Sequence, residues 1–344
     1  MKFFPKHRTT FLGYKSASKP KDVIRINANE GRIESHNRTY PLKRDYQLLN
    51  KFSKIYGVDP DNLLIDRGVD GILELIFQVF DSPETRVLTS YPTYGMYRIL
   101  AEINGQEYLE LPLQKNGQLH ERFLLEASRD GQIIIICRPN NPTGNICPID
   151  EVVSVLEETQ NNSLVVLDEA YAEYLKTNER GLDLINKYSN LIVCRTLSKA
   201  YALAGLRVGF GIACPELVEK LCPFQSPYPV SSIVSDWLIK NFNEQWIERA
   251  VEDIKIVERE KVKLAEMLTP FGDVDISRAN FVNLYSSSSE YIYLVLKKNN
   301  IEVRHFPQLN LIRFSIGKDE ELQSLYKVLK KEIRKNLNTK GCER

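Results

Sequence analysis

Short, uninterrupted runs of apolar residues alternate along the chain with amphipathic stretches. The most apolar runs, rich in β-branched residues, lie at 133–137, 164–167 and 191–194. Strands of this composition are usually buried on both faces, as in a parallel sheet that is covered by helices. Helical periodicity over 45–56 and 71–80 precedes these runs, and strand and helix patterns then alternate. The pattern predicts an α/β fold with a doubly wound, mostly parallel sheet.

The last third of the chain predicts a second, smaller domain. Helical stretches over 233–268 lead into it, two short strand patterns follow at 302–305 and 311–317, and a final amphipathic helix begins after Asp319. We therefore expect an arm at 1–40, a large domain at 41–240, a smaller α/β domain at 241–335 that packs with the arm, and a frayed tail at 336–344.

Composition narrows the range of partners. The 344 residues include 46 basic and 45 acidic side chains, so there is no net field to attract nucleic acid or an anionic membrane. The amino-terminal residues lack a long apolar run, which predicts a soluble, cytoplasmic protein. The cysteines show no C-x-x-C spacing and the four histidines are scattered, which predicts reduced thiols and no metal site.

One lysine stands among small and apolar residues. Lys199 follows the apolar run 191–194 and precedes Ala200. Its ammonium group would be desolvated there unless it reacts or forms a pair, and desolvation lowers the pKa of a lysine. The resulting neutral amine can attack an aldehyde. The ordinary alternative is a lysine that extends to solvent from a strand end, but the polar residues upstream favour the reactive lysine.

Polar side chains also follow the other two apolar runs. The turn at 138–144 contains two prolines and a glycine; such a turn is rigid, is compatible with a cis peptide bond, and would fix the amide of Asn141. Asp168 ends the run 164–167, and Tyr171 follows it. In open α/β sheets the carboxyl ends of the strands are where ligands bind.

Two nucleotide-binding alternatives lack support. An aspartate after an apolar strand is also found in P-loop ATPases, but the chain contains no G-x-x-x-x-G-K-[ST] motif. The glycines at 205, 209 and 211 do not have the spacing of a dinucleotide fingerprint.

The chemistry-bearing positions form a series along the chain: Asn141-Pro142-Thr143-Gly144, Asp168, Tyr171, Ser198-Lys199 and Arg207. Their order and spacing resemble those of the fold-type I pyridoxal-phosphate aminotransferases, and among these most closely the histidinol-phosphate aminotransferase family. The resemblance extends from about residue 14 to about residue 317. It implies a fold-type I α/β enzyme that forms a homodimer and uses pyridoxal 5'-phosphate.

The resemblance also implies the role of each matched residue. Lys199 would bond to the cofactor aldehyde and move the substrate proton, and Asp168 would keep the ring nitrogen protonated. Asn141 and Tyr171 would donate to the phenolate oxygen, which makes Tyr171 part of the catalytic set. The other cofactor residues would be Tyr94, stacked on the ring, and the phosphate ligands Gly68, Val69, Asp70, Thr196, Ser198 and Arg207, with Tyr40 from the neighbouring subunit.

Two arginines of the smaller domain would bind the substrate. By resemblance, Arg313 would bind the α-carboxylate of L-glutamate and, with Arg304, the phosphate of an amino-alcohol phosphate. Tyr14 and Asn29 match substrate residues of the amino-terminal arm. The reaction implied is a ping-pong exchange of the amino group between L-glutamate and imidazole-acetol phosphate in histidine biosynthesis.

The chain also departs from the family pattern. Gly68-Val69-Asp70-Gly71 stands where the family usually has Gly-Ser/Ala-Asp-Glu, and the segments 30–40 and 304–313 are short. These changes keep the cofactor chemistry and leave the substrate open between histidinol phosphate, another amino-phosphate or aromatic substrate, and decarboxylation of a phosphorylated amino acid. A cofactor-sensing regulator is a further alternative, but it would need a DNA-binding domain that the amino-terminal arm is too short to hold.

Overall fold

The computed structural model describes residues 1–14, 24, 26–35, 37–82, 84–160 and 162–341. The chain divides into two compact units, the first made of Met1–Asn141 with Ile146–Ala250 and the second of Pro142–Asn145 with Val251–Arg344. Where the sequence predicts a boundary near residue 240, the units divide after Ala250. The sequence pattern also does not separate Pro142–Asn145 from its neighbours, whereas the structure assigns this segment to the second unit.

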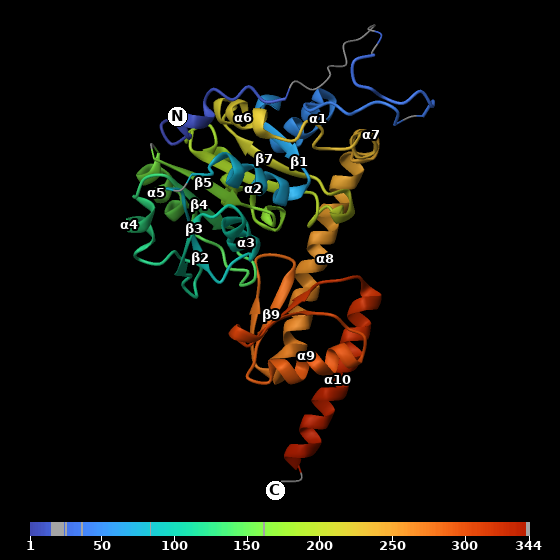
Figure 1. Cartoon of the computed structure of the whole chain (residues 1–344). Coiled ribbons are helices and arrows are strands. Elements are labelled where there is room, and N and C mark those ends of the chain that lie inside the picture. Colours follow the sequence, from blue (N-terminus) through green and yellow to red (C-terminus); the bar gives the residue numbers. More distant parts are fainter. Residues whose placement is uncertain (15–23, 25, 36, 83, 161, 342–344) are drawn as a thin grey trace. The chain divides into compact units, whose positions relative to one another are not determined.

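Helices and strands alternate in the first unit as the sequence predicts (Figure 1). Its helices are α1 (Tyr46–Tyr56), α2 (Gly68–Val79), α3 (Met96–Ile103), α4 (Phe123–Ala127), α5 (Ile149–Thr159), α6 (Pro215–Leu221), α7 (Ser232–Asn241) and the first part of α8 (Glu244–Leu268). Its strands are β1 (Leu63–Asp66), β2 (Arg86–Tyr91), β3 (Glu107–Pro112), β4 (Gln132–Cys137), β5 (Ser163–Asp168), β6 (Leu191–Thr196) and β7 (Gly209–Ala213).

These strands form one sheet in the order β1-β7-β6-β5-β4-β2-β3. Strand β7 is antiparallel to both of its neighbours, and the remaining pairs are parallel. The carboxyl ends of β1, β2, β4, β5 and β6 therefore lie along the same edge. The predicted fold class is confirmed.

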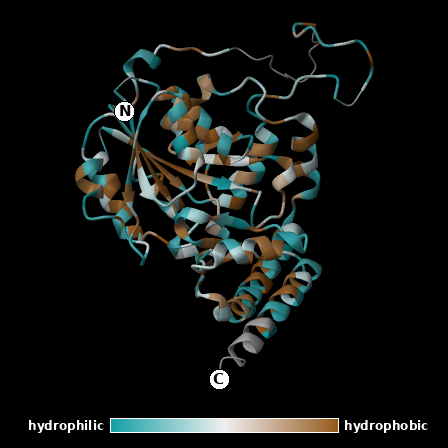
Figure 2. Ribbon diagram, turned by 60° about the horizontal axis from the view of Figure 1, so that its bottom comes forward, coloured by the Kyte–Doolittle hydropathy of each residue, from teal (hydrophilic) through white to brown (hydrophobic). Residues whose placement is uncertain are grey.

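Burial on both faces explains why the central strands are continuously apolar. Ile134 and Val165 pack into the core on one face of the sheet, whereas Ile133 and Val166 pack into the core on the other. All four side chains are completely buried, and burying such a side chain contributes about 1.5–3 kcal/mol. The strands are accordingly brown, at the hydrophobic end of the scale, in Figure 2.

Two helix ends differ from the sequence expectation. Helix α2, expected at 71–80, begins at Gly68, because Gly68 adopts a φ of 77° and turns the chain directly out of β1. Helix α10 (Asp319–Gly341) continues through most of the tail that was expected to fray from residue 336, and 342–344 lie outside the described residues.

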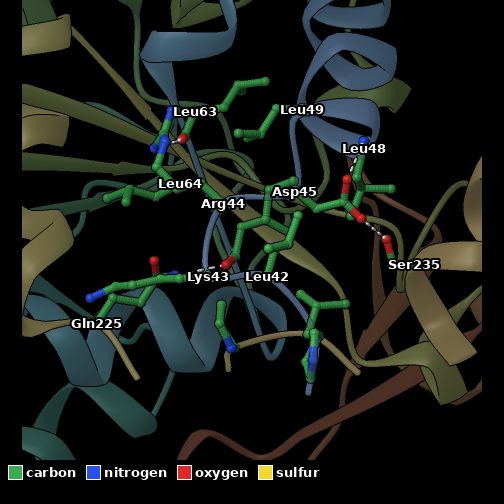
Figure 3. Close-up of a pocket in the computed structure, with 14 residues that line it drawn as sticks. Leu42, Lys43, Arg44, Asp45, Leu48, Leu49, Leu63, Leu64, Gln225 and Ser235 are labelled. Atoms are coloured by element: carbon green, nitrogen blue, oxygen red, sulfur yellow. Dashed lines mark hydrogen bonds between the residues drawn. The ribbon is translucent and has the colours of Figure 1, made fainter. Parts of the chain in front are cut away.

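The chain that leads from the arm into α1 is attached firmly to the first unit (Figure 3). Asp45 caps α1 and accepts a hydrogen bond of 2.5 Å from the hydroxyl of Ser235. Arg44 donates to the carbonyl of Leu63 at 3.1 Å. The cavity beside these residues holds about 20 Å³, room for about one water molecule. The hydrogen bonds of Arg44 and Asp45 hold the chain that follows Tyr40.

The second unit contains a smaller antiparallel sheet in the order β10-β11-β9-β8. Its strands are β8 (Asp273–Ile276), β9 (Phe281–Tyr285), β10 (Arg304–Phe306) and β11 (Leu311–Ser315), and its helices include α9 (Ser289–Lys298) and α10. Apolar residues of the sheet and of α8, α9 and α10 form its core.

No described helix combines the length and the apolar character that crossing a membrane requires.

Candidate functional site

A cavity of about 200 Å³ opens in the first unit among segments that follow the strand ends. Nearly all of the predicted cofactor residues line it: Gly68, Val69, Asp70, Tyr94, Asn141, Asp168, Tyr171, Thr196, Ser198, Lys199 and Arg207. Cys137 and Ala170 complete the lining. Segments far apart in the sequence therefore meet because parallel strands deliver their carboxyl ends to one edge.

Asp168 is the buried anion of this cavity. Tyr97, on α3, donates a hydrogen bond of 2.6 Å to Oδ2 of Asp168, and the N–H of Ala170 donates to Oδ1 at 3.1 Å. Burial raises the pKa of the Asp168 carboxyl, while these two hydrogen bonds act in the opposite direction. Tyr97 is completely buried, and the sequence analysis gave it no role. Its only sequence signal was its place three residues after Tyr94.

Lys199 reaches into the same cavity from the chain after β6. Its side chain is half-buried, and its Nζ lies 5.2 Å from the centroid of the Tyr171 ring. The primary amine therefore shares one cavity with the Asp168 carboxylate and the Asn141 amide. This placement differs from that of a lysine whose ammonium group extends into bulk solvent.

The start of α2 contributes backbone N–H groups to the lining of the cavity, through Gly68 and Val69. Arg67 precedes α2 without a side-chain cap, and the first N–H groups of a helix have no intrahelical partners. A Cβ placed on Gly209 of β7 would lie only 2.3 Å from the carbonyl carbon of Gly68, so this glycine allows β7 to contact the helix start. The hydroxyls of Thr196 and Ser198, two residues that also line the cavity, lie 3.0 Å apart.

Arg207 and Asp70 form an ion pair at this end of the cavity. Nη2 of Arg207 lies 3.0 Å from Oδ2 of Asp70, and the Tyr94 hydroxyl donates to Oδ1 at 3.3 Å. Burial, and then the charge of Asp70, raise the pKa of Tyr94 to about 12, so it remains a neutral donor. Arg207 has a φ of 54°, a conformation that costs about 1–2 kcal/mol for a side-chain-bearing residue. The sequence pattern predicted Asp70 as a phosphate ligand and did not indicate its ion pair with Arg207.

Asp66 explains the unusual glycine at position 71. The Asp66 carboxylate accepts hydrogen bonds from the N–H of Arg67 at 2.7 Å and from Nε2 of Gln225 at 2.9 Å. A Cβ on Gly71 would lie 2.6 Å from Oδ1 of this carboxylate. The departure from the family pattern thus accommodates a bonded carboxylate at the end of β1.

A buried ion network supports the three strand ends that carry Asn141, Asp168 and Lys199. Glu169 accepts from Arg138 at 3.2 Å and from Arg195 at 2.6 Å, and Arg195 also lies 3.3 Å from Glu173. Two positive and two negative groups are balanced there, which a low-dielectric interior requires. The network was not identified from the sequence, although an arginine directly after a wholly apolar strand was a signal. The Arg138–Pro139 peptide is cis.

The remaining predicted residues lie outside this cavity lining. Tyr40 is 47% exposed and stacks on Tyr228 with a centroid distance of 4.5 Å. Tyr14 and Asn29 are exposed. Arg304 and Arg313 belong to the second unit, where both line a cavity of about 500 Å³.

Comparison with known proteins agrees with this geometry. Residues 11–329 match the family described as aminotransferase class I and II. The chain belongs to this family. The histidinol-phosphate aminotransferase of Aeromonas salmonicida is 31% identical to this aminotransferase over 325 residues, which are 90% of this chain and 91% of the relative.

Solved structures share the fold. The histidinol-phosphate aminotransferase of Sinorhizobium meliloti in complex with pyridoxal-5'-phosphate superimposes with a TM-score of 0.77 at 23% identity, covering 87% of this chain and 84% of that one. The L-threonine-O-3-phosphate decarboxylase of Porphyromonas gingivalis gives 0.70 at 20% identity, covering 87% and 91%. At these identities the likeness concerns the fold alone.

The cavity of this aminotransferase fits pyridoxal phosphate, the cofactor of the family. Asp168 provides a buried anion for a protonated ring nitrogen, and Lys199 provides the amine. The start of α2, two hydroxyls and Arg207 suit a phosphate dianion. The predictions of a transaminase and of this cofactor are confirmed.

Proposed function

We propose that this aminotransferase transfers the amino group of L-glutamate to imidazole-acetol phosphate, giving 2-oxoglutarate and histidinol phosphate, or catalyses the reverse reaction, in histidine biosynthesis. Curated relatives that match nine-tenths of the chain are named histidinol-phosphate aminotransferase. The reaction has two halves, because bound pyridoxal phosphate would serve as the carrier of the amino group between the two substrates.

The observation that carries the substrate proposal is the pairing of two guanidinium groups in the second unit. Arg304 and Arg313 are register partners on β10 and β11. Their Cζ atoms lie 5.6 Å and 5.7 Å from the centroid of the same ring, that of Phe306. Two planar guanidiniums at paired strand positions suit a phosphate dianion or a carboxylate bound through two oxygens. Both proposed substrates carry such an anion.

Each cofactor residue then has a separate task. Pyridoxal phosphate supplies the electron sink when bound. The Lys199 amine would hold the cofactor aldehyde and, when free, would move the proton at the substrate Cα. Asp168 would hold the proton of the ring nitrogen, and Asn141 and Tyr171 would donate to the phenolate oxygen. The first turn of α2, with Thr196, Ser198 and Arg207, would bind the phosphate.

We further propose that the enzyme is a homodimer in which Tyr40 binds the cofactor phosphate of the neighbouring subunit. Tyr40 is half exposed and does not belong to the cavity lining among the described residues of its own chain. Its hydroxyl would donate to a phosphate oxygen.

The half-reactions provide the test. The protein loaded with pyridoxal phosphate is mixed separately with L-glutamate, histidinol phosphate and phenylalanine, and the conversion of the lysine-bound cofactor to pyridoxamine phosphate is followed by absorbance. Rapid conversion by both L-glutamate and histidinol phosphate is expected. Conversion by L-glutamate alone would contradict the proposed acceptor, and release of carbon dioxide without a keto product would identify a decarboxylase instead.

Lys199→Ala gives a stricter test of the mechanism. It should lose both turnover and the absorption band of the lysine-bound cofactor, because no other primary amine is proposed for the bond. Lys263→Ala, which removes an exposed lysine that pairs with Glu260, is the matched control and should retain both. Full activity in Lys199→Ala would overturn the assignment.

A further inference from the structure

The segment Pro142–Asn145 directly follows the cavity residue Asn141 in the chain. Asn141 lines the cavity of the first unit, and the next residue in the chain already belongs to the second unit. The chain returns to the first unit at Ile146. A single peptide bond therefore joins a proposed cofactor ligand to backbone that is packed in the other unit.

Asn283 of β9 is the side chain that holds this segment. It is completely buried, and its Nδ2 donates to the carbonyl of Pro142 at 2.9 Å and to that of Thr143 at 3.0 Å. The N–H of Arg278 donates to the carbonyl of Gly144 at 2.9 Å. Three consecutive carbonyls after Asn141 are thus bonded to the second unit.

Close packing at Gly144 strengthens this attachment. Gly144 has a φ of 78°, and a Cβ there would lie 2.1 Å from Cβ of Ser277 and 3.2 Å from the ring of Phe281. The buried Lys261 in turn donates to the carbonyl of Ser277 at 2.7 Å. The segment Pro142–Asn145 therefore packs against Ser277, whose carbonyl is in turn bonded to Lys261.

Asn283 lies in register with the proposed substrate arginines of the small sheet. Asn283 is the register partner of Arg313, which is the partner of Arg304. Side chains at paired positions of an antiparallel sheet share one face. Asn283 and the two arginines are therefore separate side chains on one face of the small sheet, and a substitution of Asn283 removes neither guanidinium group.

We propose that Asn283 is a positioning residue that orients Asn141 toward the cofactor through the backbone of 142–145. The proposal rests on the proposed role of Asn141 at the cofactor. Small displacements of a positioning group commonly reduce turnover by about ten- to a hundredfold.

The test compares Asn283→Leu with Asn190→Leu. Leucine is close to asparagine in size but has no donor. Asn190 is also completely buried and donates through Nδ2 to Oγ1 of Thr159 and the carbonyl of Ser163, both at 3.2 Å, but it precedes β6 at the edge opposite the cavity. The first measurement is hydrogen exchange of the backbone amides in 140–147, on protein without cofactor. Exchange should be about tenfold faster in Asn283→Leu and unchanged in Asn190→Leu.

The second measurement uses the loaded enzyme. Asn283→Leu should weaken pyridoxal-phosphate binding and lower the rate of the L-glutamate half-reaction at saturation about tenfold, with a smaller change in the KM for L-glutamate, because Arg313 remains. If Asn283→Leu does not fold, Gly144→Ala displaces the same segment and is measured in the same way. Exchange and rates that match those of Asn190→Leu would overturn the proposal.

Failure of the proposed function would look different. In that case histidinol phosphate would not react with the wild-type enzyme, whereas exchange in 140–147 and cofactor binding would still respond to Asn283→Leu. If instead histidinol phosphate reacts and Asn283→Leu behaves as Asn190→Leu does, only the positioning role of Asn283 is wrong.

Discussion

Asp168 is subject to two opposing influences on its proton. Burial raises the pKa of the carboxyl, and the hydrogen bonds from Tyr97 and Ala170 favour the ionised form. Only the ionised carboxylate can hold the proton of a ring nitrogen. We therefore expect Tyr97, which is not among the residues that line the cavity, to contribute to function by stabilising the ionised form of Asp168.

Removing the Tyr97 hydroxyl tests this role. Tyr97→Phe retains the ring and loses the donor, so the pKa of Asp168 should rise further. The acid limb of the kcat/KM profile should then move to higher pH, with a smaller loss of activity at high pH. Tyr326→Phe is the control, because Tyr326 donates to Glu260 at 2.7 Å in the second unit. An unmoved acid limb in Tyr97→Phe would argue against the role.

At the scale of elements, the contact between β7 and α2 shapes the proposed phosphate site. The antiparallel strand β7 lies beside β1, from whose end α2 begins. Gly209 allows the strand to approach the backbone of Gly68 and Val69 directly. The buried ion network around Glu169 holds the ends of β4, β5 and β6 together. Glu169, which follows β5, pairs with Arg138 after β4 and with Arg195 of β6.

Gly209→Ala should separate these two elements. Its Cβ would lie 2.3 Å and 2.5 Å from backbone atoms of Gly68 and Val69, which cannot rotate away as a side chain would. We expect a loss of about 1–3 kcal/mol in the free energy of unfolding and at least about tenfold weaker cofactor binding, measured by urea denaturation and absorbance titration. Gly205→Ala, where a Cβ meets no atom within 4 Å, should stay within about 0.5 kcal/mol of the wild type. Equal behaviour of the two variants would contradict the interpretation.

At the scale of the whole molecule, the proposed dimer would complete the site. Tyr40 follows an arm with several exposed apolar side chains, among them Ile26, which is 92% exposed, and Ile33, which is 87% exposed. In the proposed dimer we expect the neighbouring subunit to cover these side chains. The anchored segment around Arg44 and Asp45 would then present Tyr40 to the neighbouring subunit.

Subunit complementation tests whether Tyr40 acts across the interface. Tyr40→Ala and Lys199→Ala are each expected to be weakly active or inactive at limiting pyridoxal phosphate. In a mixed dimer one site would carry both changes and the other would carry neither, so mixing the two variants should restore activity if Tyr40 acts in the neighbouring subunit. Sedimentation should give a mass about twice that of the chain. A monomer, or a mixture without recovered activity, would contradict the proposal.

How far the site could be predicted depends on the range of each interaction. Lys199, Asp168 and Asn141 each follow an apolar strand, so a local pattern places them at one sheet edge. Tyr97 could not be assigned, because its function depends on contact with a residue on a distant strand. The roles of the cofactor and substrate residues, the domain limits at 40, 240 and 335 and a cytoplasmic location remain predictions.

The sequence by itself determined the doubly wound fold, the family and the order of the chemistry-bearing residues, because apolar runs, turns and spacings are properties of contiguous chain. Only the tertiary structure decided that Asp70 neutralises Arg207, that Asp66 requires Gly71, and that Pro142–Asn145 belongs to the second unit. Each of these depends on side chains or backbone that meet across long sequence separations. Such contacts follow from packing the completed elements, and no local pattern encodes them.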